Sequence, residues 1–283
     1  MQMIKKAAIV CCSNGQHVKQ KQNIDMLCNI LNSLGIECVF GEHIYADENG
    51  FCGTAKERAE GLMNFYKDTS IDAIYDISGG DLANEILPLL DYEVIAKSGK
   101  MFWGYSDLTT IINAIYEKTG VCSVLYQVRN LLYKNQEQQI RDFSETVLEG
   151  KESLYRFAYS FLQGEEMSGI VVGGNIRCLL KLAGTPYWPD MRGKILLLES
   201  YSGNAARMTA YFSQLKQMGV FEQVQGVLLG TFTEMEREGY LPKVETLILQ
   251  YVDKNLPVAV TKEIGHGTDS KAVMIGKNIV LQQ

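Results

Sequence analysis

The segment KMFWGYSDLTT, residues 100–110, decides the fold class. A strand predicted over Lys100–Trp103 ends at Gly104, and a tight turn holding Ser106 leads directly into an amphipathic helix predicted over Leu108–Lys118. A strand that passes into a helix within a few residues is the unit from which α/β proteins with parallel sheets are built. The same alternation is therefore expected on either side of this segment.

The first half of the chain repeats the alternation. Short apolar runs predict strands at Ala7–Cys12, Ile36–Phe40 and Ala73–Ile77. Helical spacing of apolar residues predicts helices at Asn23–Leu34, Ala55–Lys67 and Asn84–Leu90. Such an order implies a mainly parallel sheet covered on both faces, with the active site at the carboxyl ends of the strands.

Residues 134–166 differ in character and mark a domain boundary. The stretch KNQEQQIR, residues 134–141, is polar, a helical stretch is predicted up to Phe161, and Gly164 suggests a turn. We therefore divide the chain into domains at 1–165 and 166–283. The second domain is expected to contain strands at Ser168–Val172, Lys194–Leu198 and Gly226–Gly230, short β segments around Val258 and Ile279, and helices at Ile176–Leu182, Asn204–Met218 and Val244–Asp253.

Composition excludes several classes of function. The 283 residues include 27 Lys and Arg against 33 Asp and Glu, and this net charge of -6 argues against binding to nucleic acid or to an anionic membrane. No apolar run reaches the ~18 residues of a membrane span, and no signal-peptide pattern is present. The seven cysteines are scattered without a C-x-x-C pair, which favours a cytoplasmic protein with neither a disulfide framework nor a zinc site.

Ser106 is the first candidate for chemistry. Its strand–turn–helix setting resembles a nucleophile elbow, although the second glycine of G-x-S-x-G is absent. The Asp107 amide at the helix start would point a donor toward a developing oxyanion, which favours acyl transfer. The alternative interpretation is that Ser106 only caps the helix.

Gly79 and Gly80 form a second suggestive turn after the strand at Ala73–Ile77. Glycines here allow a ligand to approach the backbone closely, but they also suit an ordinary strand-to-helix turn. The pair lacks the remaining residues of a G-x-G-x-x-G or P-loop motif, so it is weak evidence for phosphate binding.

A serine nucleophile needs a base, and the chain has three histidines, at positions 17, 43 and 266. His266 lies between two glycines in the sequence IGHGT, which suits an accessible, constrained imidazole better than the setting of His17 or His43. Glu199 ends a buried strand, where a carboxylate is costly unless it is paired. A Ser–Glu–His set in this chain order is the resulting hypothesis, with a surface-loop role for His266 as the alternative.

The chain resembles the LD-carboxypeptidase family of serine peptidases, which includes the microcin C immunity proteins. Five blocks carry the resemblance over nearly the whole length: the glycine pair with NEILP and LDY, GYSDLT at 104–109, GGN at 173–175 with GTPY at 184–187, GKILLLE at 193–199, and Pro257 with Gly265 and His266. The Asn-bearing glycine-pair block is more similar to the microcin-immunity branch than to the murein-recycling branch.

The resemblance implies roles and a fold. It implies a Ser106–His266–Glu199 triad and an oxyanion hole made by the backbone amides of Gly80 and Asp107. It implies a flavodoxin-like N-terminal domain, a smaller swivelling β/β/α C-terminal domain, and a substrate cleft between them that involves Gly79. It also implies a homodimer and no metal or organic cofactor.

Three segments depart from the family pattern and leave the substrate open: CSNG at 12–15, YQVR at 126–129 and the short loop SYSGN at 200–204. Trp188 is expected either to stack on a substrate ring or to pack half-buried, and Asn175 either to bind substrate or to hold a turn.

The expected function is a cytoplasmic serine carboxypeptidase-type hydrolase that cleaves a C-terminal peptide or amide-like bond. Candidate substrates are murein tetrapeptides and peptidyl or aminoacyl nucleotide conjugates. The main alternative is a catalytically silent protein that binds such small peptides or conjugates on the same two-domain scaffold. A nucleotide-binding oxidoreductase is a weaker alternative, because SNG at residues 13–15 supplies only one glycine for the first turn.

Overall fold

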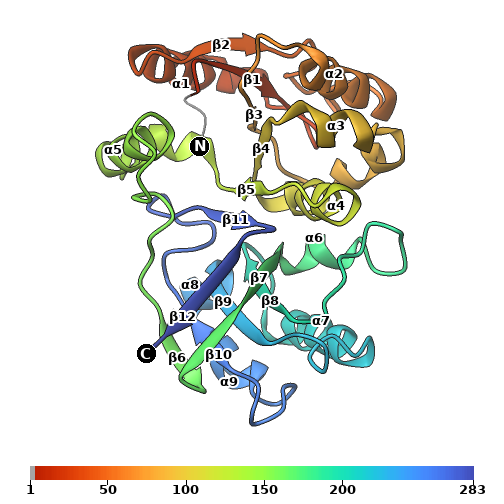
Figure 1. Ribbon diagram of the computed structural model, residues 1–283, viewed down its shortest axis with the longest axis vertical. Helices are drawn as coiled ribbons and strands as arrows, with labels where there is room; N and C mark the ends of the chain where they lie inside the picture. The colour runs from red at the N-terminus through yellow and green to blue at the C-terminus, as the bar shows by residue number, and fades with distance from the viewer. Residues whose placement is uncertain (1–3) are drawn as a thin grey trace.

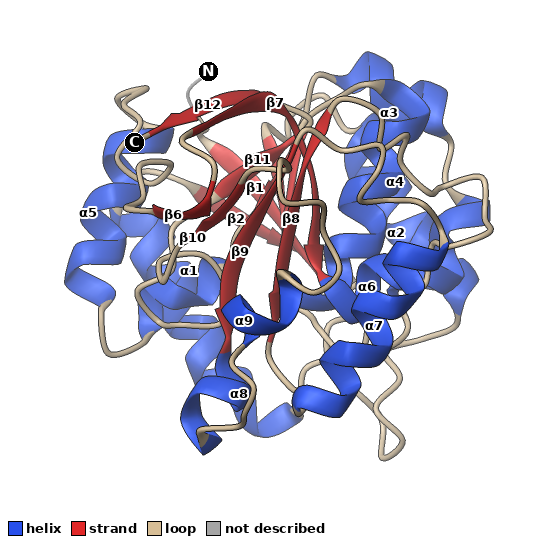
Figure 2. Cartoon of the chain, turned by 90° about the horizontal axis from the view of Figure 1, so that it is seen from below, coloured by secondary structure: helices blue, strands red, loops and turns tan. Residues whose placement is uncertain are grey.

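The computed structural model describes residues 4–283, which form two six-stranded sheets with helices around them (Figure 1). The first sheet has the order β11-β5-β4-β3-β1-β2, and the second has the order β12-β7-β8-β9-β10-β6. Figure 2 shows the strands of both sheets in the centre of the molecule and helices on the outside. The α/β class predicted from the sequence is therefore confirmed.

The first sheet is flavodoxin-like. Its parallel strands are β1 (Lys6–Val10), β2 (Glu37–Phe40), β3 (Ala73–Asp76), β4 (Met101–Gly104) and β5 (Ser123–Leu125). Their order in the sheet is 2-1-3-4-5: β2 lies on one side of β1, and β3, β4 and β5 follow on the other side. In parallel sheets of this kind ligands bind between the two strands where the order switches sides, here β1 and β3, beyond the carboxyl ends of the strands. The segments after β1, β3 and β4 are therefore brought to one edge.

Helices cover both faces of this sheet. They are α1 (Lys21–Ser33), α2 (Ala55–Lys67), α3 (Tyr92–Ser98), α4 (Thr109–Thr119) and α5 (Gln136–Val147). Helix α2 begins with a capping box, in which the Thr54 side chain accepts from the Glu57 amide and the Glu57 carboxylate accepts from the Thr54 amide. The helix predicted at Asn84–Leu90 is a 3-10 helix, η2 (Ala83–Leu89), and further 3-10 turns lie at η1 (Val18–Gln20), η3 (Ser106–Leu108) and η4 (Val128–Leu132).

The second sheet is mixed. Its strands are β6 (Ser160–Gln163), β7 (Glu166–Asn175), β8 (Lys194–Ser200), β9 (Gly226–Phe232), β10 (Val258–Val260) and β12 (Asn278–Gln282), of which β6 and β12 are antiparallel edges. Its helices are α6 (Ile176–Leu180), α7 (Ala205–Gln217), α8 (Thr233–Glu238) and α9 (Val244–Ile248).

Two helix predictions were wrong. The helical stretch expected up to Phe161 ends at Val147, and the chain then passes into β6, whose aromatic Phe161 packs against the core. The helix expected over Val244–Asp253 ends at Ile248, because the following residues form turns rather than a continuing helix. The short elements β5 and α8 were not predicted, since three to six residues give little periodicity.

The two halves of the chain share strands and core. Strand β11 (Val273–Ile275), although late in the sequence, pairs antiparallel with β5 of the first sheet. One apolar cluster includes Ile112 and Leu125 from the first half together with Val171 and Leu197 from the second. The sequence division at residue 165 stays a prediction, and the swivelling of the second domain does too.

Asn113 of α4 joins the halves through polar contacts as well. Its buried amide donates to the Gly173 carbonyl at 2.9 Å and accepts from the Gly173 amide at 2.8 Å.

No helix in residues 4–283 combines the length and the apolar character needed to cross a membrane.

We expect Asn113→Ala to lower the free energy of unfolding by about 2–4 kcal/mol, because it leaves two buried backbone groups of Gly173 without partners. Urea titration followed by circular dichroism measures this loss. The matched control is Asn23→Ala on the exposed face of α1, which should change stability by less than about 0.5 kcal/mol. Equal stabilities of the two variants would contradict the role given to Asn113.

Candidate active site

Ser106 stands in a strained turn at the carboxyl end of β4. Its φ of 55° is the only positive value among the non-glycine residues that the structure describes. A left-handed backbone costs a residue with a side chain about 1–2 kcal/mol, and such strain is concentrated at functional sites. The predicted strand–turn–helix around Ser106 is confirmed.

The alternative interpretation of Ser106, a helix cap, is wrong. The cap positions before η3 and α4 are Tyr105 and Leu108, and neither helix start has a side-chain cap hydrogen bond. Throughout residues 4–283, no hydrogen bond involves the Ser106 hydroxyl. The hydroxyl instead faces a polar cavity of about 360 Å³, whose lining residues are Gly80, Asp81, Ser106, Asn175, Arg177, Ser200, Tyr201, Ser202 and Arg207.

Glu199 and His266 lie in direct contact. The Glu199 Oε2 atom is 2.6 Å from the His266 Nδ1 atom, and the two side chains are 1% and 8% exposed. Glu199 is placed by the ladder of β8, where it stands beside Asn175 of β7. His266 is placed by a loop that Ser270 ties together, its hydroxyl donating to the Gly265 and Gly267 carbonyls at 2.7 Å each.

Two aromatic rings flank the imidazole of His266. The Tyr105 ring centroid lies 4.3 Å from it and the Tyr201 ring centroid 4.9 Å. Tyr105 precedes Ser106 in the chain, and Tyr201 lines the Ser106 cavity. The imidazole of His266 therefore lies next to the Ser106 turn and to the loop that follows β8. Burial, together with the nearby Glu199 carboxylate, raises the pKa of the Tyr105 hydroxyl well above its usual value. Among the residues described, no hydrogen bond joins Ser106 to His266.

The glycine pair approaches Ser106 closely. A β-carbon on Gly79 would lie 3.9 Å from the Ser106 Cβ atom. Gly80 has a φ of 126°, and a β-carbon there would lie only 2.0 Å from Asn14 Oδ1, so only glycine fits. The Asp107 amide opens the helix next to Ser106, and within residues 4–283 it donates no hydrogen bond.

Of the two predicted substrate-binding residues Asn175 and Trp188, only Asn175 lines the Ser106 cavity. The Asn175 side chain accepts from the Cys178 amide at 3.3 Å and also lines the Ser106 cavity, so both interpretations of this residue have structural support. Trp188 is half-buried against the apolar core and is not one of the residues that line that cavity.

The two other histidines lie apart from this site. His17 accepts from the Lys19 amide at 3.0 Å in an exposed turn, and neither it nor His43 contacts Glu199.

Two polar features of the site were missed by sequence reasoning. The Asp107 carboxylate is fully buried and accepts from the Ser13 hydroxyl at 2.7 Å and from the Lys181 ammonium at 2.5 Å. Arg177 and Lys181 of the second half reach the Gly80–Asp81 segment. Their i,i+4 spacing was visible in the sequence, but nothing there indicated the partner.

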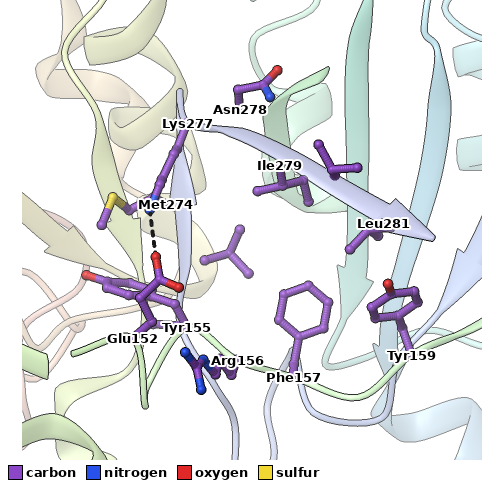
Figure 3. Close-up of a pocket in the computed structure, with 13 residues that line it drawn as sticks. Glu152, Tyr155, Arg156, Phe157, Tyr159, Met274, Lys277, Asn278, Ile279 and Leu281 are labelled. Atoms are coloured by element: carbon purple, nitrogen blue, oxygen red, sulfur yellow. Dashed lines mark ion pairs between the residues drawn. The ribbon is translucent and has the colours of Figure 1, made fainter. Parts of the chain in front are cut away.

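A second cavity, of about 370 Å³, lies between the linker around residues 152–159 and strands β11 and β12 (Figure 3). Figure 3 shows Phe157 and Tyr159 near Ile279 and Leu281, with the 3.6 Å ion pair of Lys277 and Glu152 at the other end. It shares no lining residue with the Ser106 cavity and contains neither His266 nor Glu199, so it is not the candidate active site.

Both halves of the chain match domains of one known protein family. Residues 7–127 match the LD-carboxypeptidase N-terminal domain, and residues 168–281 match the LD-carboxypeptidase C-terminal domain. A probable murein peptide carboxypeptidase of Bacillus subtilis is 27% identical over 90% of this chain and 82% of its own length. The microcin C7 self-immunity protein MccF of Escherichia coli is 26% identical over 81% of this chain and 76% of its own length.

The fold is also that of solved relatives. The structure of MccF in complex with aspartyl sulfamoyl adenosine covers 100% of this chain and 97% of its own, with a TM-score of 0.88 and 22% sequence identity. Both domain matches, in the expected order, fall on the two halves that bring Ser106, Glu199 and His266 to neighbouring positions. The chain therefore belongs to the LD-carboxypeptidase family of peptidases.

Proposed function

We propose that the protein is a serine carboxypeptidase-type hydrolase that acts through Ser106, His266 and Glu199. The observation that carries this proposal is the buried 2.6 Å contact between Glu199 and His266 Nδ1, beside a cavity that holds a strained serine with an unbonded hydroxyl. A carboxylate on Nδ1 orients an imidazole and leaves Nε2 free to accept a proton.

In the proposed reaction, the Ser106 hydroxyl attacks the carbonyl carbon of the scissile bond while His266 Nε2 takes its proton. The amides of Gly80 and Asp107 donate to the oxyanion of the tetrahedral intermediate. His266 then gives the proton to the leaving amine, the C–N bond breaks, and water hydrolyses the acyl-enzyme by the reverse roles. Glu199 stabilises the imidazolium throughout.

Three buried cysteines are poor rivals to serine as the nucleophile. Burial raises the pKa of the Cys11 and Cys12 thiols well above their usual value, and burial also raises the pKa of Cys178. Such thiols stay protonated near neutral pH and are poor nucleophiles. None of the seven cysteines forms a disulfide, which supports the proposed cytoplasmic location.

Arg207 supports a substrate with a free carboxylate. It lines the Ser106 cavity, and within residues 4–283 its guanidinium forms no ion pair. A guanidinium is suited to bind a carboxylate with two hydrogen bonds, as a carboxypeptidase requires.

We expect Arg207→Gln to raise KM about tenfold for a peptide with a free C-terminal carboxylate and to leave kcat within about threefold. Steady-state kinetics on that peptide and on its C-terminal amide measure the effect, which should be lost with the amide. Arg192→Gln is the matched control, because Arg192 is exposed and pairs with Asp190 outside the cavity. An unchanged KM in Arg207→Gln would remove this support.

The candidate substrates are a murein tetrapeptide and an aminoacyl nucleotide conjugate, by analogy with the names of the relatives. Mass spectrometry of the products from a murein tetrapeptide and from aspartyl sulfamoyl adenosine distinguishes these two. A homodimer stays a prediction from the resemblance.

The second candidate function is a catalytically silent protein that binds a small peptide or a nucleotide conjugate. The missing hydrogen bond between Ser106 and His266 favours it, although such bonds often tighten only when substrate is bound. A fluorophosphonate probe separates the two functions: a hydrolase is labelled at Ser106, and a silent binding protein is not.

A further inference from the structure

Helix α6 and the residue after it present two cations to the Ser106 site from the other half of the chain. Arg177 and Lys181 are four residues apart, so they project from the same side of this turn of the chain. Arg177 Nη2 donates to the Gly80 carbonyl at 2.8 Å, and Arg177 also forms an ion pair with the Asp81 carboxylate. The Lys181 ammonium donates to the Asp81 carbonyl at 2.8 Å.

These contacts hold two successive peptide units at both ends. In the unit between Gly80 and Asp81, Arg177 binds the carbonyl and Asn14 Oδ1 accepts from the amide at 2.7 Å. In the next unit, Lys181 binds the Asp81 carbonyl and the Ser13 hydroxyl accepts from the Leu82 amide at 3.3 Å. Since a peptide unit is planar, holding both ends fixes the orientation of these two units, and the unit that carries the Gly80 amide is joined to them directly at the Gly80 Cα atom.

Lys181 also holds the segment that follows Ser106. Its ammonium lies 2.5 Å from Asp107 Oδ1, and the other oxygen of Asp107 accepts from Ser13 and from the Ala83 amide at 2.9 Å. The Asp107 side chain is 0% exposed and that of Lys181 is 20% exposed, so the ion pair is shielded from water. One ammonium therefore joins the glycine-pair segment to the Ser106 turn.

We propose that Lys181, assisted by Arg177, is a positioning residue that aligns the Gly80 and Asp107 amides toward the oxyanion. This inference rests on the proposed hydrolase function and adds to it residues from the second half of the chain. Neither cation touches the reacting atoms, and both act through the backbone that they hold. Oxyanion donors must be aligned before the reaction, since a misplacement of about 1 Å costs up to about 100-fold in rate.

The test is Lys181→Met, which keeps the length of the side chain and removes its charge. We expect kcat to fall about 30- to 100-fold and KM to stay within about threefold, because transition-state stabilisation is lost and substrate binding is not. The rate of fluorophosphonate labelling of Ser106 should fall by a similar factor. Steady-state kinetics and timed labelling measure the two effects.

Lys100→Met is the matched control. The Lys100 ammonium also holds backbone carbonyls, those of Phe65, Tyr66 and Asp68, but it lies before the amino end of β4, the strand whose carboxyl end leads to Ser106. This variant should lose stability and keep kcat within about threefold. A kcat in Lys181→Met equal to that in Lys100→Met would overturn the proposal.

Arg177→Gln keeps the test decisive if Lys181→Met does not fold. Arg177 is 37% exposed, and its loss releases only the Gly80–Asp81 segment, so we expect kcat to fall about three- to tenfold with KM unchanged. An unchanged kcat in Arg177→Gln, with Lys181→Met unfolded, would also overturn the proposal.

The wild-type chain separates the two possible failures. If the wild type neither turns over substrate nor reacts with the probe, the proposed hydrolase function fails. If the wild type is active and these variants match it, only the positioning role fails.

Discussion

Ser106→Ala should reduce kcat by about 10⁴-fold or more while the protein stays folded and still binds substrate. The loss follows because the hydroxyl is the proposed nucleophile. Stability should not change, because the hydroxyl makes no hydrogen bond within residues 4–283 and alanine adopts the same backbone at the same cost. Turnover is followed by mass spectrometry, substrate binding by calorimetry and stability by thermal unfolding.

Ser106→Gly provides a sharper version of this test. Glycine adopts a φ of 55° without strain, so this variant should be equally inactive yet more stable than the alanine variant by about 1 kcal/mol. Ser202→Ala is the matched control, since Ser202 lines the same cavity and should keep full activity. Unchanged turnover in Ser106→Ala would refute the mechanism.

Glu199→Gln should reduce kcat by about 10³- to 10⁴-fold, with little change in KM. A carboxylate 2.6 Å from His266 Nδ1 accepts a hydrogen bond from the Nδ1–H group, which keeps the proton on Nδ1 and leaves Nε2 free as the base. A glutamine can instead donate its amide hydrogen to Nδ1, which moves the imidazole proton to Nε2 and removes the base. Kinetics give the loss of rate, and nitrogen NMR gives the tautomer, with only three histidines to assign.

The control for this variant is Glu263→Gln. Glu263 lies three residues before His266 and accepts from the Ala158 amide at 2.9 Å, without contacting the imidazole. It should keep kcat within about threefold and leave the tautomer of His266 unchanged. A Glu199→Gln enzyme with wild-type kcat would show that the carboxylate does not orient the base.

Strong local signals made much of the fold predictable. Apolar runs gave the strands β1, β3 and β4, and the chain order of strands and helices gave a parallel sheet. The contact between Glu199 and His266 was also anticipated, because a carboxylate at the end of a buried strand requires a partner.

Other features depend on contacts between distant residues, which one sequence does not reveal. The segment Val273–Ile275 has only three apolar residues, and nothing in them indicates that this strand joins the first sheet rather than the second. Lys181 reads as a surface lysine after a helix, and only the folded chain shows that it lies against the buried Asp107. The cap interpretation of Ser106 failed because the local sequence does not specify the positive φ of that residue.

Strand β11 has a consequence for the order in which this protein is made. During synthesis, β5 leaves the ribosome long before its neighbour β11 exists, so one edge of the first sheet remains open while the second half is translated. The apolar surface that later packs against β7 and β8 is uncovered until those two strands have been made. The first sheet is therefore begun first, yet it gains its last strand only after β10 of the second sheet has been made.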